Sequence, residues 1–419
     1  MSIAQKFNQL VVLLIIMRPE LSQIGLLTRH FRLSRGAITS LVGLVMVFAF
    51  AKIQAGTFVE WALPVGSPGP TANNAYLATS SEPLHLLPTF DDDGHVFFTQ
   101  RNLGYLGMLA PESGNITEWS LGGSALPHDI TMVGGTLVIT EEGLGSIGQF
   151  QPNKNTIKEW LVPTSGSLPY HEARYQQFIY FTEARGNKIG RLNLHTNVIT
   201  EWNLPSANSL PVGMDISSDG RYLWFAEETG NKVALFDTVD GTITEWADPI
   251  GILIVHIKVS GGVTFFTDQG QNSQMVGEID PSTNTLNIWN TPTVNSEPGD
   301  LDVFQLRQGY LITFTEFIGN NVAVLDTSTQ APSFTTTVTP VTTSETPVST
   351  TVTPTSRTLT RTQSKVQPTV TQNVNPVVTG GFAEWAVPTT DSGPGGIATV
   401  DGILLFTERA GNKVGVLVP

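Results

Sequence analysis

Three histidines recur at a constant spacing in this sequence and are the first candidates for chemistry. His85, His128 and His171 follow one another at intervals of 43 residues. Two glutamates, Glu142 and Glu228, each come directly after a glutamate that belongs to a repeated motif. A pair of imidazoles beside a carboxylate can transfer a proton and hold a divalent cation. The competing interpretation is that these histidines only hydrogen-bond neighbouring carbonyls in loops.

The histidine spacing follows a sequence repeat. A tryptophan, preceded by Glu in six of seven cases, recurs at Trp61, Trp119, Trp160, Trp202, Trp246, Trp289 and Trp385. A second motif, Phe181-Thr182-Glu183 in the third repeat, also occurs seven times. From residue 119 to residue 289 the tryptophans are 41, 42, 44 and 43 residues apart, which is the period of four-stranded propeller blades. The sequence therefore predicts an all-β, seven-bladed β-propeller.

The third repeat and the two ends of the chain predict the strands. In the third repeat, β-branched and aromatic runs at 170–175, 178–183, 188–192 and 198–202 are separated by turn residues. The C-terminal repeat supplies three such runs and lacks the fourth. Residues 57–61 have the missing pattern, so we expect the N-terminal strand to complete the last blade without a covalent link.

Composition divides the chain into four parts. Residues 1–56 form a leader, and within it an apolar run at 37–51 follows several basic residues, as in a signal peptide or a membrane anchor. Residues 57–330 hold the closing strand and the blades up to part of blade 6, and 380–419 hold the remainder. Residues 331–379 are rich in Thr, Pro, Ser and Val, which predicts a disordered, stalk-like insertion.

The net charge and the predicted leader limit the classes of partner and the location that are compatible with this sequence. The formal net charge of -14 repels phosphate backbones and excludes nucleic acid as a partner. The leader predicts an extracellular or cell-surface protein that is secreted or held to the membrane by its N-terminal segment. We expect a monomer with a small-molecule, peptide or glycan ligand in the axial funnel, where loops of seven blades converge. Tyr170, His171 and Glu183 are the candidate substrate-binding residues.

Three segments carry a resemblance to a known family. Trp224-Phe225-Ala226-Glu227, Gly411-Asn412-Lys413-Val414-Gly415 and Ile199-Thr200-Glu201-Trp202-x-x-Pro205 resemble the streptogramin lyase (virginiamycin B lyase) family. The similarity covers the propeller and leaves out the leader and the Thr/Pro-rich insertion. It implies a seven-bladed propeller that opens a cyclic depsipeptide by elimination at its ester, with Mg²⁺ and a histidine base on one face.

The resemblance also implies roles for individual residues. His128, preceded by Pro127, matches the catalytic histidine, and Glu142 matches a carboxylate that helps to hold the Mg²⁺. His85 matches a second catalytic histidine, with one extra residue between it and its proline. Leu126 stands where the family motif has a glutamate, so one expected metal ligand is missing. Ca²⁺ is the alternative cation.

Two classes of function are compatible with these features. The first is a metal-assisted carbon–oxygen lyase that acts on a cyclic ester, and the combination of His85, His128 and Glu142 favours it. The second is a non-catalytic surface propeller that recognises a glycan, peptide or protein, and the predicted export and insertion favour it. A calcium-assisted, lactonase-type propeller is a third and less favoured possibility.

Overall fold

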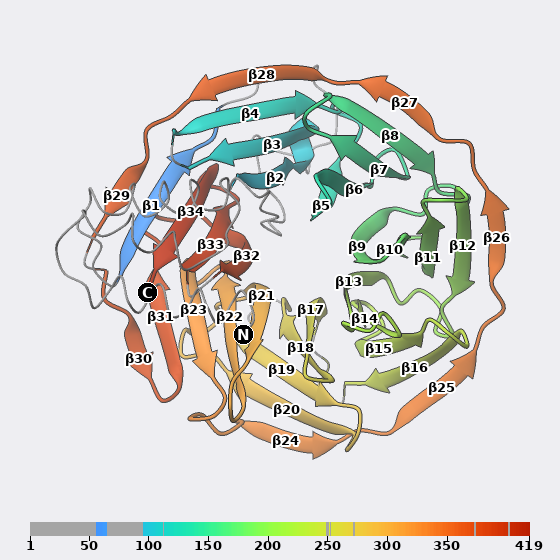
Figure 1. Ribbon diagram of the computed structural model, residues 1–419. Helices are drawn as coiled ribbons and strands as arrows, with labels where there is room; N and C mark the ends of the chain where they lie inside the picture. The colour runs from blue at the N-terminus through green and yellow to red at the C-terminus, as the bar shows by residue number, and fades with distance from the viewer. Residues whose placement is uncertain are drawn as a thin grey trace, which may run out of the picture.

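A computed structural model describes residues 56–64, 95–111, 113–248, 251, 253–270, 273–372, 374–400 and 403–419. His85 and the apolar run at 37–51 lie outside these residues. Within them, no helix is long and apolar enough to cross a membrane. The described chain forms seven antiparallel sheets arranged as a ring around a central axis (Figure 1). This confirms the predicted seven-bladed, all-β propeller.

The blades follow one another in chain order. Blades 1 to 3 contain β2 (Val96–Gln100), the 3-10 helix η2 (Arg101–Leu103), β3 (Tyr105–Ala110) and β4 (Asn115–Ser120); β5 (Pro127–Val133), β6 (Thr136–Glu141), β7 (Ser146–Gln151) and β8 (Thr156–Leu161); and β9 (Pro169–Tyr175), β10 (Phe178–Glu183), β11 (Lys188–Asn193) and β12 (Val198–Asn203). Blades 4 to 6 contain β13 (Pro211–Ile216), β14 (Tyr222–Glu227), β15 (Lys232–Asp237) and β16 (Thr242–Ala247); β17 (Ile254–Ser260), β18 (Val263–Asp268), β19 (Met275–Asp280) and β20 (Thr285–Asn290); and β21 (Pro298–Gln305), β22 (Tyr310–Glu316), β23 (Asn321–Asp326) and β31 (Phe382–Ala386). In blades 2 to 7 the first strand lies nearest the axis (Figure 1), and β2 of blade 1 corresponds to the second strand of the other blades.

Blade 7 joins the two ends of the chain. It contains β32 (Pro394–Val400), β33 (Ile403–Glu408), β34 (Lys413–Val418) and, as its fourth strand, β1 (Thr57–Ala62). β1 pairs with β34 in antiparallel register from Thr57↔Val418 to Ala62↔Lys413. The predicted non-covalent closure is therefore confirmed.

The Thr/Pro-rich insertion is ordered, and the predicted disordered stalk is wrong. It forms seven short strands that run backwards around the rim, one on the outer edge of each blade (Figure 1). These strands are β24 (Phe334–Thr337), β25 (Pro340–Ser344), β26 (Val348–Thr351), β27 (Thr355–Thr358), β28 (Thr360–Lys365), β29 (Thr369–Thr371) and β30 (Val377–Thr379). The segment needs no core of its own, because existing sheet edges supply its hydrogen bonds and Thr and Val favour extended backbone.

The repeated motifs join neighbouring blades. The threonine of the Phe-Thr-Glu motif reaches the inner strand of the next blade, as in the hydrogen bond from Thr140 Oγ1 to the Tyr170 carbonyl (2.6 Å). The tryptophan reaches the outer turn of the next blade, as in the bond from Trp160 Nε1 to Asn197 Oδ1 (2.9 Å). Asn197 has a φ of 55°, a left-handed conformation that Asn and Gly tolerate best. Blade 2 is therefore fixed to blade 3 at both the axis and the rim.

This outer joint makes a stability prediction for Asn197. Asn197→Gly keeps the left-handed turn but removes the acceptor for Trp160, which we expect to cost about 1 kcal/mol of unfolding free energy. Asn197→Ala adds backbone strain and should cost about 2 kcal/mol. Chemical denaturation measures both. Asn208→Ala, at an exposed residue with the same φ of 55°, is the control for strain alone. Equal stability of wild type and Asn197→Ala would contradict the role of this joint.

Candidate functional site

A β-bulge in the inner strands aims side chains at the axis. The pairing of strands one and two shifts register at the start of the inner strand in blades 2 to 7, for example between Pro127 and Ile130 and between Pro298 and Leu301. An extra residue at a bulge bends the strand and redirects its side chain. His128 and Asp300 lie in two of these bulges. The same backbone irregularity therefore carries different residues in different blades, from His128 in blade 2 to Gly395 and Gly396 in blade 7.

A second repeat position completes the ring of side chains. In each blade, the residue that follows the acidic or amide end of the second strand lies on the same face as the bulge. In blades 1, 2, 5, 6 and 7 these residues are Arg101, Glu142, Gln269, Phe317 and Arg409. The two positions together contribute nearly all of the residues around the axial pocket.

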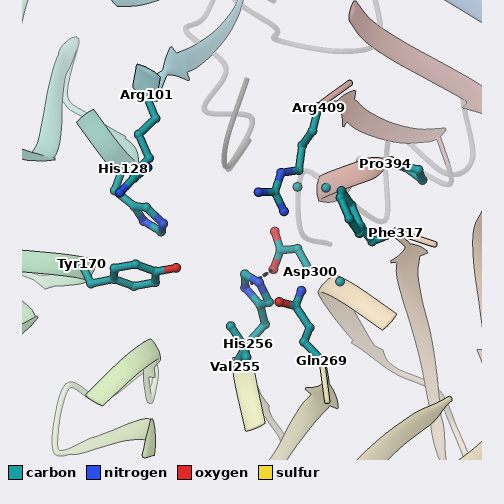
Figure 2. Close-up of a pocket in the computed structure, with 13 residues that line it drawn as sticks. Arg101, His128, Tyr170, Val255, His256, Gln269, Asp300, Phe317, Pro394 and Arg409 are labelled. Atoms are coloured by element: carbon teal, nitrogen blue, oxygen red, sulfur yellow. Dashed lines mark ion pairs between the residues drawn. The ribbon is translucent and has the colours of Figure 1, made fainter. Parts of the chain in front are cut away.

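The pocket has a volume of about 280 Å³. Figure 2 shows His128, Tyr170 and Arg101 on one side, with Arg409, Asp300 and His256 across the opening. Gln269 and Phe317 complete the polar and aromatic wall. The pocket therefore offers imidazole, phenol, guanidinium, amide and carboxyl groups within one small space.

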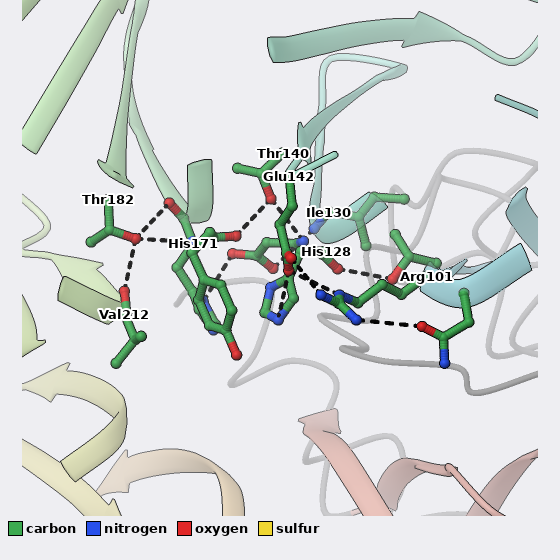
Figure 3. Close-up of polar contacts among 12 residues, drawn as sticks. Arg101, His128, Ile130, Thr140, Glu142, His171, Thr182 and Val212 are labelled. Carbon is green, nitrogen blue, oxygen red and sulfur yellow. Dashed lines mark hydrogen bonds and ion pairs between the residues drawn. The ribbon is translucent and has the colours of Figure 1, made fainter. Parts of the chain in front are cut away.

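His128 lies at the centre of one cluster of contacts. Its ring lies against that of Tyr170, with centroids 3.7 Å apart and a tilt of 34° between the planes. Its Nε2 is 3.7 Å from Glu142 Oε1 (Figure 3). Arg101 donates to both oxygens of Glu142, from Nε to Oε1 (3.0 Å) and from a terminal nitrogen to Oε2 (2.6 Å). The bidentate pair holds the carboxylate and the guanidinium in fixed orientation.

Two further imidazoles continue from His128. The His171 ring lies 5.4 Å from that of His128 and 5.5 Å from that of His256. His171 Nδ1 is 3.0 Å from Asp129 Oδ2, and His256 Nδ1 is 3.5 Å from Asp300 Oδ1. Each of the three histidines therefore has a carboxyl group beside it.

Burial sets the protonation of these groups. Loss of solvation, followed by the charges of His171 and Arg101, lowers the pKa of His128 well below its usual value. Burial likewise lowers the pKa of His256 and raises the pKa of Asp300 to about 6. Burial also raises the pKa of Tyr170. At neutral pH the pocket therefore holds neutral imidazoles at 128 and 256 and a phenol that remains a donor.

The structure brings most of the predicted site residues together. His128 and Tyr170 line the pocket, while His171 and Glu142 contact His128 or lie beside it. His85 lies outside the described residues. Glu183 does not line the pocket: it is fully buried at the end of β10, where the charge of Glu201 in the same blade acts on it. That position argues against a substrate-binding role for Glu183.

Sequence reasoning missed part of the pocket. His256 comes 85 residues after His171, close to two blade periods, so extension of the histidine series beyond three blades would have found it. Arg101 and Arg409 occupy the same repeat position as Glu142 and could have been found by aligning that position in all blades. Asp300 gave no comparable signal, because most other inner strands carry a different residue at its place.

The described residues around Glu142 do not fit a divalent cation. Both Glu142 oxygens accept hydrogen bonds from Arg101, and Leu126 supplies no side-chain oxygen. A hard cation needs several oxygen ligands. In the part of the chain that the structure describes, no group of three or more His, Asp or Glu side chains is arranged to hold a metal ion. Arg101 supplies a fixed positive charge at the place where the resemblance implied Mg²⁺.

The repeated carboxyl groups form pairs away from the pocket. Four Phe-Thr-Glu-type glutamates are repelled by the charge of the glutamate before the tryptophan of the same blade: Glu141 by Glu159, Glu183 by Glu201, Glu227 by Glu245 and Glu408 by Glu60. Burial raises the pKa of these four inner glutamates to about 8, 9, 8 and 8, in that order. One proton per pair is thus retained near neutral pH.

Comparison with known proteins gives one family and one fold. The virginiamycin B lyase family model matches residues 69–319. A solved structure of streptogramin B lyase has 21% identity and a TM-score of 0.62, over 86% of this chain and 97% of that chain. A catalytically inactive virginiamycin B lyase from Staphylococcus aureus, solved with quinupristin, has 22% identity and a TM-score of 0.61, over 86% and 98%. No curated protein matches the chain.

The paired glutamates predict a defined pH dependence of stability. The pKa of Glu183 is raised to about 9 in the folded state. Its protonation therefore contributes fully to the free energy of unfolding below the usual pKa of a glutamate, and this contribution is lost as the pH rises toward 9. Glu183→Gln removes this titration and keeps a donor for Glu201, as Gln100 does for Glu118 in blade 1 (3.0 Å).

The measurement is the free energy of unfolding as a function of pH. Between about pH 5 and pH 9, the free energy of unfolding of Glu183→Gln should rise relative to that of wild type by up to about 1.4 kcal/mol per pH unit, because only wild type loses a stabilising proton. Asp219→Asn, at an exposed residue, is the charge-matched control and should not show this gain. Parallel curves for Glu183→Gln and wild type would show that Glu183 holds no extra proton in the folded protein.

Proposed function

Because the chain belongs to the virginiamycin B lyase family, we propose that its axial pocket binds an acyl or carboxylate group of a small molecule or peptide without a metal ion. The apolar run at 37–51 supports a location outside the cytoplasm for this activity. The observation that carries the proposal is the convergence of Arg409, Tyr170 and Arg101 on one pocket.

Arg409 is the principal anion-binding group in this proposal. Its guanidinium lies 4.7 Å from the ring centroid of Phe317, which orients it in the pocket (Figure 2). Arg101 is already engaged by Glu142, so its charge is largely balanced. A guanidinium matches the geometry of a carboxylate and donates two parallel hydrogen bonds to it. The Tyr170 hydroxyl can donate a third.

The side of the pocket that carries Arg409 also offers groups for a polar, uncharged or cationic part of the same ligand (Figure 2). Asp300, with a pKa raised to about 6, and the Gln269 amide both border the pocket there. The volume of about 280 Å³ is at the small end for ligand sites. It therefore seats a small ligand, or one residue of a larger peptide or depsipeptide.

Carbon–oxygen elimination in the same pocket is the second candidate function. The neutral imidazole of His128 supports it, because a neutral imidazole can accept a proton from the carbon beside a carbonyl group. The electron pair of that C–H bond would form a carbon–carbon double bond as the neighbouring C–O bond breaks. The departing carboxylate would then be received by Arg409, so that the product is an isomer of the substrate.

Arg409 provides the test of the binding proposal. With a streptogramin B compound as the probe, we expect calorimetry on wild-type protein to show binding, and Arg409→Met to weaken it by roughly tenfold to a hundredfold. Arg221→Met is the matched control, since Arg221 is half-exposed, paired with Asp237 and located in the β13–β14 turn, outside the pocket lining. Equal weakening by both variants, or no binding by wild type, would contradict the proposal for this class of ligand.

A second experiment separates elimination from binding and tests the metal. Chromatography with mass detection of the same compound after incubation would show a ring-opened product of unchanged mass if the protein catalyses elimination. Hydrolysis would instead add the mass of one water. We expect Mg²⁺ and EDTA to leave binding, and any elimination, unchanged, because Arg101 already occupies both oxygens of Glu142. His128→Gln should abolish elimination and spare binding. Activity that requires Mg²⁺ would refute the metal-free site.

A further inference from the structure

The strands of residues 331–379, here called the belt, meet every blade at the same register. In each blade one belt residue lies opposite the residue that precedes the repeat tryptophan: Phe334↔Ile288, Val341↔Glu245, Val348↔Glu201, Thr355↔Glu159, Thr362↔Glu118, Thr369↔Glu60 and Val377↔Glu384. Six of these belt residues are seven residues apart, and the last step is eight. The belt is therefore a seven-residue repeat that matches the ring blade by blade.

Each repeat of the belt also makes one fixed contact at a blade junction. Between successive belt strands, one residue donates its backbone N–H to a carbonyl in an outer turn of the ring. These bonds run from Val338 to Asn284 (2.9 Å), Glu345 to Gly241 (3.4 Å), Val352 to Asn197 (2.9 Å), Leu359 to Asn155 (2.7 Å), Val366 to Gly114 (2.8 Å) and Val374 to Gly56 (2.9 Å). Five of the six side chains are apolar. Val338 and Leu359 are 6% and 4% exposed, and Val352, Val366 and Val374 pack on the adjoining cores.

One ion pair distinguishes the registers of the belt. In blades 3, 4 and 7 a lysine at the start of the third strand contacts the glutamate before the tryptophan, as Lys232 Nζ does with Glu245 (2.7 Å). Blade 2 has Ser146 at that place. There the cation comes from the belt: Arg357 contacts Glu159 at 2.6 Å and lies 4.0 Å from Glu141. A shifted belt would leave this buried acid pair without a cation.

The belt also covers the seam of the ring. β1 closes blade 7 through non-covalent contacts, and the chain has no cysteine for a disulfide. β29 pairs with the outer edge of β1, so the closing strand lies inside a sheet rather than at its edge. The belt leaves blade 6 after β23 and returns to it at β31, which makes it a continuous loop around the other blades (Figure 1).

We propose that residues 331–379 lock the propeller, with one apolar residue per repeat and Arg357 fixing their register, so that the belt must detach before the β1 seam can open. The belt would then act mainly on the rate of unfolding, since that rate is set by the interactions that break before the transition state is reached. Its Thr-rich, low-complexity composition is what an edge strand exposed on its outer face requires.

Hydrogen exchange on the full chain tests whether the belt is present. We expect peptides spanning 331–379 to be protected, with the amides of Val352, Leu359 and Val366 exchanging much more slowly than a free chain. Complete exchange of the whole segment within seconds would overturn the proposal. This readout needs no variant and does not depend on any activity.

Leu359→Ala tests the locking role. Removal of this buried side chain should loosen peptides around 355–365 and speed unfolding in denaturant by roughly tenfold. Val348→Ala is the matched control, because Val348 lies on the same belt but is 59% exposed and should change neither quantity. Arg357→Gln is expected to act like Leu359→Ala. A belt loosened by Leu359→Ala with an unchanged unfolding rate would refute the locking role.

Discussion

The constraint behind this structure is that one position of the repeat must face the same neighbour in every blade. Thr140 and Trp160 show how the chain meets it, with one hydrogen bond to the next blade near the axis and another at the rim. Phe181 fills the layer between them, and Gly190 opposite it has no room for a side chain, since an added Cβ would lie 2.2 Å from the ring. Once these joints are set, the remaining positions are free to vary, and the pocket residues are drawn from them.

The balance of buried charge explains why this site differs from the one that the family resemblance implied. A buried glutamate needs a cation or a proton. Most of the inner glutamates of the blades keep a proton by pairing with a second glutamate, whereas Glu142 is held by Arg101. The two solutions differ in consequence. A shared proton stabilises a blade without presenting charge, while an arginine fixes a positive group at the wall of the axial pocket.

The architecture was predictable from the sequence because period and pairing are local properties. The strands of the third repeat and the closure by β1 followed from the patterning of residues 57–61 and 170–202. The pocket was only partly predictable. His128 broke the repeat visibly, but Arg409 and His256 became members of the site only when the ring brought residues of six blades together around one pocket. The spacing of residues within one blade does not specify which residues of other blades will lie beside them at the pocket.

The composition of the belt led to a wrong prediction of disorder, whereas its seven-residue period would have indicated ordered strands. Residues 331–379 have too few apolar side chains to build a core, and that argument is correct for an isolated segment. It does not apply to a chain that borrows its hydrogen bonds from sheet edges already in place. Such a chain needs about one apolar residue per blade, and Val352, Leu359 and Val366 supply it at intervals of seven residues. In a repeat protein, a low-complexity insertion should therefore be searched for a spacing that matches the host repeat before it is taken as disordered.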